Sequence, residues 1–157
     1  MDLRDFLKSI PELQTLDNDD IDRLAQMAKR GAVKAGQPID QQGKPADKFY
    51  ILETGRLGVT LDLDIGVSQK SYVVTTIGPG DMFAWSGLVG NPNYTAGSRA
   101  MTDCTFIEWQ ADKLKAEFEA DARLGYVVMR AVAQTVASRL RAMQIQLVQQ
   151  YALSQAE

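Results

Sequence analysis

Hydrophobic residues recur every three or four positions over residues 1–30, and this spacing predicts two short helices. The first runs from Asp2 to Ser9 and ends before Pro11. The second follows the acidic segment 17–20, whose carboxylates suit the positive end of a helix dipole. Its apolar stripe consists of Ile21, Leu24, Ala25 and Ala28.

From Gly31 onward the hydrophobic period shortens to about two, which is typical of β-strands. Short runs of β-branched and aromatic residues are separated by turns that carry glycine. We expect strands at residues 32–34, 38–40, 48–52, 57–61, 71–77, 94–96 and 104–109. Many short strands at such spacing predict an antiparallel roll or barrel, because that architecture protects the sheet edges.

The helical period returns after residue 110, with a short helix expected at 111–119 and a long one from Ala122 onward. Along the long helix, apolar residues repeat with heptad-like spacing, which is typical of a packed seam. The seam consists of Met129, Val132, Val136, Leu140, Met143, Leu147 and Tyr151. Either a dimer interface or packing against the strands would explain it.

The order of helices, strands and helices predicts one α+β domain over residues 1–157. We expect N-terminal helices over 1–30, a β-roll over 31–109 and C-terminal helices over 110–151. A length of 157 residues suits a single domain.

Charge and composition limit the functional classes. The net charge of −3 leaves no broad basic face, which disfavours nucleic-acid binding by this chain. Neither a run of 18 apolar residues nor the apolar segment of a signal peptide is present, so we expect a cytoplasmic protein that does not enter the membrane.

The sequence contains no histidine, so the commonest metal ligand and general base are missing. Its one cysteine, Cys104, excludes an internal disulfide and lies in an apolar run, where a buried structural thiol is expected. We therefore expect neither an enzyme nor a metal site.

Three segments and the long helix resemble the cyclic-nucleotide-binding domain family, which includes catabolite-activator and FNR-like sensor domains. Gly55-Arg56-Leu57, after residues 49–54, resembles that family's second and third strands. Residues 77–83 resemble the turn into its phosphate-binding cassette, and residues 94–100 the strand that leaves the cassette. The similarity spans roughly residues 6–150. It implies an antiparallel double-stranded β-helix (a jelly-roll barrel), a cassette at 79–100 and dimerisation through the final helix.

In such a cassette, a glycine turn leads into a short helix whose free N–H groups hold an anion. The resemblance places this helix within 83–95. The amides of Ala84, Trp85, Ser86 and Gly87 would lie nearest the anion, and small residues at 84 and 87 would permit close approach.

The chain also departs from the family pattern. Phe83-Ala84-Trp85 stands where the family usually has Phe-Gly-Glu, and Tyr94 stands where it has a phosphate-binding arginine. Thr95 retains the small hydroxyl residue that often follows. The two losses would weaken affinity for a cyclic nucleotide by about two to four orders of magnitude. Matching the final helix by position places Met143 and Gln144 nearest the pocket, where Gln144 could hydrogen-bond a ligand ring.

Three interpretations remain open. The pocket is remodelled for another small anionic or nucleotide-like ligand, or it retains cyclic-nucleotide binding, or Trp85 and Tyr94 fill it and leave a structural, dimerising protein. The Trp85-Ser86 pair also resembles a subgroup of small bacterial regulator-like proteins, which favours a remodelled pocket.

The leading hypothesis is a ligand sensor that signals through its C-terminal helix, around a hinge at 120–125. We expect a homodimer and an unknown protein effector. Because six residues follow Tyr151, a helix-turn-helix module is not expected, nor is direct DNA binding.

Overall fold

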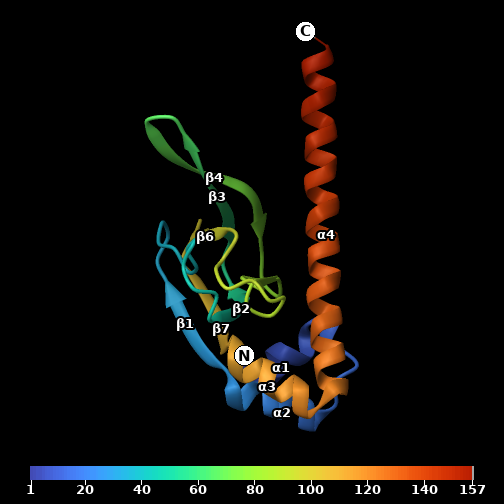
Figure 1. Cartoon of the computed structure of the whole chain (residues 1–157). Helices are drawn as coiled ribbons and strands as arrows, with labels where there is room; N and C mark the ends of the chain where they lie inside the picture. The colour runs from blue at the N-terminus through green and yellow to red at the C-terminus, as the bar shows by residue number, and fades with distance from the viewer. Residues whose placement is uncertain (157) are drawn as a thin grey trace.

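The computed structural model describes residues 1–156 and has the predicted order of helices, strands and helices (Figure 1). The N-terminal elements are α1 (Leu3–Ser9), the 3-10 turn η1 (Pro11–Leu13) and α2 (Asn18–Met27). The strands are β1 (Lys29–Val33), β2 (Lys48–Thr54), β3 (Leu57–Ile65), β4 (Ser68–Ile77), β5 (Met82–Phe83), β6 (Gly97–Ala100) and β7 (Cys104–Gln110). The C-terminal helices are α3 (Ala111–Ala120) and α4 (Ala122–Gln155). The α+β class is confirmed.

The strands form two antiparallel sheets, ordered β1-β7-β2-β5 and β4-β3-β6. One hydrophobic cluster joins them, with members from both sheets: Tyr50, Leu52, Leu57, Val59, Ile77, Phe83, Ala100, Cys104 and Phe106. The two sheets therefore enclose a common core, as in a jelly roll, although the ladders described over residues 1–156 do not close into one continuous barrel.

Strand β2 is apolar at consecutive positions because both of its faces are covered. Tyr50 and Leu52 point into the core between the sheets. Phe49 and Ile51 point to the opposite face, where a second cluster includes residues of α1, α2, α3 and α4. This alternation fixes the helices against the first sheet.

Helix α2 begins at a capping box, as the acidic segment predicts. The Asp17 carboxylate accepts the Asp20 N–H at 2.9 Å, and the Asp20 carboxylate accepts the Asp17 N–H at 3.2 Å. These bonds satisfy amides that the first helical turn leaves without partners.

Several predicted strand limits are wrong. Residues 38–40 form no strand, and Pro38 makes one isolated bridge to Arg99. Residues 94–96 are not a strand either, because the backbone of Tyr94 pairs with the loop at Gly43 and Lys44. Strand β6 begins at Gly97 instead, where it reaches β3. Strand β1 begins at Lys29, inside the range expected for the N-terminal helices.

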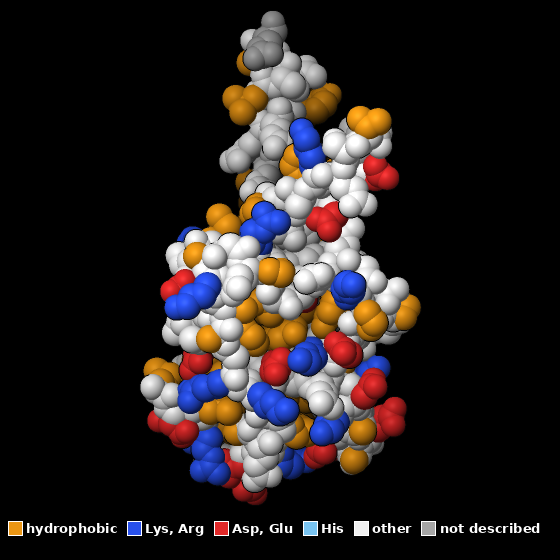
Figure 2. Space-filling model, turned by 90° about the vertical axis from the view of Figure 1, so that its left-hand side faces the viewer, with side chains coloured by type: hydrophobic (Ala, Val, Ile, Leu, Met, Phe, Trp, Pro, Cys, Tyr) orange, Lys and Arg blue, Asp and Glu red, His pale blue; other side chains and the backbone are white. Residues whose placement is uncertain are grey.

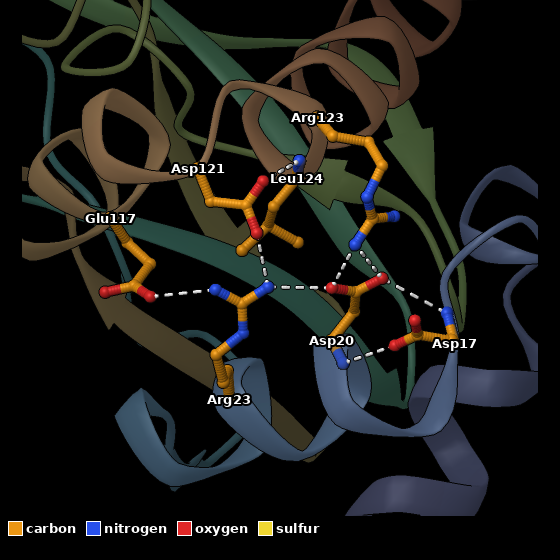
Figure 3. A network of polar contacts seen from close by, with 7 residues as sticks. All are labelled: Asp17, Asp20, Arg23, Glu117, Asp121, Arg123 and Leu124. Carbon is orange, nitrogen blue, oxygen red and sulfur yellow. Dashed lines mark hydrogen bonds and ion pairs between the residues drawn. The ribbon is translucent and has the colours of Figure 1, made fainter.

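An ion-pair network joins α2, α3 and α4 where α4 begins (Figure 3). Arg23 of α2 contacts Asp20 at 2.8 Å, Glu117 at 3.2 Å and Asp121 at 2.6 Å. Arg123 of α4 contacts Asp20 at 2.7 Å. The two arginines lower the pKa of the buried Asp20 to about 2. The network fixes the start of α4 at the predicted hinge.

The predicted seam on α4 divides into two parts. Near the start of the helix, Val132 is buried and Met129 packs against the second cluster. Farther along, Leu140, Leu147 and Tyr151 are 56%, 67% and 66% exposed. Figure 1 shows the end of α4 extending beyond the strands. Residues 136–155 are called the distal segment below.

Among the described helices, none combines the length and the apolar character needed to cross a bilayer.

Candidate functional site

A cavity of about 140 Å³ lies between the predicted cassette and α4. Its walls come from four regions of the chain, namely the β1–β2 loop, β3, residues 83–98 and α4. The lining residues are Asp40, Val59, Phe83, Ala84, Trp85, Ser86, Tyr94, Thr95, Ala96, Gly97, Ser98, Arg139 and Met143. We call this space the cassette cavity. It brings together six of the predicted site residues, namely Phe83, Ala84, Trp85, Ser86, Tyr94 and Thr95.

The cassette backbone turns sharply but forms no helix, contrary to prediction. Ala84 has a φ of +58°, in the left-handed region that favours glycine. The turn that follows is held by bonds from the N–H groups of Leu88 and Asn91 to the carbonyls of Trp85 and Ser86, both at 2.9 Å. The short helix is thus reduced to a hydrogen-bonded turn.

The amides of residues 84–87 are free, as the cassette hypothesis requires. Within residues 1–156, none of these N–H groups donates to another backbone carbonyl. Successive free amides in a turn are typical of anion-binding sites. Ala84, Trp85 and Ser86 line the cavity, so this stretch could receive an anionic group.

Gly87 has a packing role instead. A Cβ at this position would lie 2.1 Å from the Ala46 carbonyl oxygen, and Gly87 does not line the cavity. The close approach predicted here is therefore to the protein's own backbone, not to a ligand.

Tyr94 lines the cavity, but its hydroxyl is already engaged. It donates to the Lys48 carbonyl at 2.7 Å and accepts the Lys48 N–H at 3.1 Å. Burial raises the pKa of Tyr94 to about 12, so the phenol stays neutral at physiological pH. Tyr94 therefore forms part of the cavity wall and contributes no charge. The neighbouring Thr95 also lines the cavity and is exposed to solvent.

Two residues of α4 line the cavity: Met143, which was expected near the pocket, and Arg139, which the sequence did not identify. The Arg139 guanidinium donates to the Met82 carbonyl at 2.8 Å and lies 4.6 Å from the centre of the Trp85 ring. Desolvation lowers its pKa. Met143 lines the cavity one turn later. The predicted Gln144 is exposed and outside the cavity, because it lies one residue round the helix from that face.

Asp40 is the second lining residue that the sequence did not identify. It is 7% exposed, and Ser98 donates to its Oδ1. Burial raises the pKa of Asp40 to about 6, and the Ser98 bond acts in the opposite direction.

Comparison with known proteins adds three findings. The sequence profile of the cyclic nucleotide-binding domain matches residues 30–121. An uncharacterized NTE family protein of Mycobacterium tuberculosis is 29% identical over 133 residues, covering 85% of this chain and 22% of that protein. The chain thus spans about a fifth of the length of this relative.

Two solved structures show the same fold at low identity. A cyclic nucleotide-binding domain from Methylobacillus flagellatus has a TM-score of 0.79 and 17% identity, covering 94% of this chain and 82% of that one. A triple mutant of the regulatory subunit of a cAMP-independent protein kinase A from Trypanosoma brucei, bound to cAMP, has a TM-score of 0.67 and 23% identity, covering 88% and 49%.

Proposed function

The chain belongs to the cyclic nucleotide-binding domain family, and on that premise we propose that it is a regulatory domain that senses a small ligand in the cassette cavity. The main observation in support of this proposal is the position of Arg139. It extends from α4 to the cassette, where it contacts Trp85 and the Met82 carbonyl. A ligand that binds beside Arg139 would change the contact between the cassette and the helix.

The cavity favours a small ligand with an anionic group. Free amides at 84–86 and the Arg139 guanidinium supply donors for the anion. The volume of about 140 Å³ is below the roughly 300–1,000 Å³ of typical ligand pockets and close to the ~150 Å³ of a cavity that holds benzene. A nucleotide would fit only if α4 moved outward.

Signalling would follow from the way α4 is held. The network around Asp20 fixes its first turn, and Val128 and Val132 anchor the next turns in the core. Beyond them, Arg139 makes the polar bond from α4 to the cassette. Ligand binding at Arg139 would therefore shift the distal segment more than the predicted hinge at 120–125.

The output would be a contact between proteins. Figure 2 shows hydrophobic side chains on the protruding end of α4, where Leu140, Leu147 and Tyr151 are more than half exposed. Their spacing suits a homodimer seam, and an effector protein could bind the same surface. Basic and acidic side chains are interspersed on the face shown in Figure 2, which does not favour DNA as the partner.

The second candidate is a structural, dimerising protein without a ligand. The engaged Tyr94 hydroxyl and the stacking of Trp85 against Arg139 favour it, because both side chains take up space in the cavity.

Tryptophan fluorescence of the full chain separates the two candidates. The titration panel contains small carboxylates, phosphates, amino acids and nucleotides, including acetate, inorganic phosphate, cAMP and cGMP. A Trp85→Phe variant identifies the signal of Trp85, because Trp109 is buried in the core. We expect a saturable change with at least one compound, weakened about tenfold or more by Arg139→Gln. The exposed Arg141→Gln is the matched control and should bind normally. Unchanged emission across the panel would favour the structural protein.

A further inference from the structure

The cassette cavity contains two charged side chains of opposite sign. Arg139 enters from α4, and Asp40 comes from the loop between β1 and β2. Burial raises the pKa of Asp40 and lowers that of Arg139, and the attraction between opposite charges opposes both shifts: Arg139 acts on Asp40, and Asp81 and then Asp40 act on Arg139. The two side chains line the same cavity, although no ion pair joins them in the described part of the chain.

Asp40 keeps part of its binding capacity. Among the side chains of residues 1–156, Ser98 alone donates to the carboxylate, at Oδ1, and the backbone N–H of Asp40 also lowers the pKa of this carboxyl. A carboxylate can accept about four hydrogen bonds, so these donors leave it capacity for a small group that enters the cavity it lines. Asp40 lines both the cassette cavity and an outer polar groove, whereas Arg139 lines the cassette cavity.

A buried carboxylate is costly unless a partner compensates its charge. A simple anion at Arg139 would be repelled by Asp40, and a simple cation at Asp40 would be repelled by Arg139. A molecule that carries an amine and an acidic group would satisfy both. The apolar wall of Phe83, Trp85 and Met143 would contact its carbon skeleton.

We propose that the cassette cavity selects a zwitterion of amino-acid size, with its acidic group at Arg139 and the cassette amides and its amine at Asp40. This proposal rests on the proposed function and specifies the ligand class. The cavity of about 140 Å³ is large enough for such a molecule and small for a nucleotide.

Calorimetry on the full chain tests the proposal with matched pairs of compounds. O-phosphoethanolamine is compared with ethyl phosphate, taurine with ethanesulfonate, and β-alanine with propionate. Each second compound lacks the amine. We expect the wild-type protein to bind at least one zwitterion about tenfold or more tightly than its amine-free partner, because one charged hydrogen bond is lost.

Asp40→Asn should abolish this preference and strengthen binding of the amine-free anions. Asp64→Asn, on the exposed hairpin between β3 and β4, is the matched control and should keep the preference. Equal affinity for both members of every pair, or a preference that survives Asp40→Asn, would overturn the zwitterion proposal and leave the proposed function intact. No binding of any zwitterion, anion or nucleotide would overturn both.

A pH series gives a second test if Asp40→Asn does not fold. Taurine keeps both charges between pH 4.5 and 7.5, whereas Asp40, with a pKa of about 6, becomes protonated. The pKa values of Tyr50, Tyr94 and Arg139 also respond to Asp40, but none of these groups changes charge in this range. The preference for taurine over ethanesulfonate should decrease at pH 4.5. An unchanged ratio would overturn the proposal.

Discussion

Replacing Asp20 with Asn should destabilise the fold in a pH-dependent manner. Asp20 is 1% exposed and contacts Arg23 and Arg123 at 2.8 and 2.7 Å. Asn keeps the shape of the side chain and an oxygen for the capping box, so the substitution removes mainly the charge.

The size of the effect follows from the pKa of Asp20, which is lowered from 3.8 to about 2. A lowered carboxyl pKa stabilises the folded state above the unfolded value, and this contribution is lost as the pH falls through the folded value. At about 1.4 kcal/mol per pKa unit, the charge contributes about 2 kcal/mol at pH 7 and roughly half of that at pH 3.

Urea unfolding at pH 7 and pH 3 measures this difference. Asp20→Asn should lower the free energy of unfolding by about 2 kcal/mol at pH 7 and by about 1 kcal/mol at pH 3. Asp19→Asn, an exposed neighbour on α2, should change it by less than about 0.5 kcal/mol. A loss equal at both pH values would show that Asp20 acts through packing, and no loss at pH 7 would refute the role of the network.

Three further predictions concern the cavity and the distal segment. Because the pKa of Asp40 is raised to about 6, its ionised form costs stability above that pH. In urea unfolding, Asp40→Asn should therefore stabilise the protein by up to about 3 kcal/mol at pH 8 and by almost nothing below pH 4. An equal stabilisation at the two pH values would contradict this prediction. Ala84→Gly should raise the melting temperature, since it relieves about 1 kcal/mol of strain at a φ of +58°; a lower melting temperature would contradict this. Leu140→Asp should shift the sedimenting mass from dimer to monomer, whereas Arg141→Asp should not; an unchanged dimer would move the interface elsewhere.

Several helices and strands could be predicted because their limits depend on residues close together in the sequence. The carboxylates at 17 and 20 determine where α2 begins, and the apolar run at 48–52 identifies β2. The failed strand at 94–96 depended on a distant partner, because the Tyr94 backbone pairs with the loop at residues 43 and 44. Propensity along the chain contains no information about that pairing.

The cassette residues of the candidate site could be predicted from the sequence, whereas most residues of the other cavity walls could not. Residues 83–86 follow from the glycine turn and the family pattern. The position of Arg139 at the cavity depends on how α4 is rotated against the cassette. Met143 lines the cavity and the next residue, Gln144, does not, which shows how sensitive that placement is. Asp40 was missed because a carboxylate in a polar loop gives no sign of burial until the loop packs against Ser98.

The most direct test follows the amide signals of residues 84–86 and the side-chain Nε signal of Arg139 by nuclear magnetic resonance. Inorganic phosphate, cAMP and O-phosphoethanolamine are each titrated into the full chain. A ligand in the cassette cavity should shift the signals of the cassette and Arg139 together, with one shared dissociation constant. If neither the cassette amides nor the Arg139 Nε signal shifts, or if the shifts are confined to surface residues away from the cavity, ligand sensing at this site is contradicted.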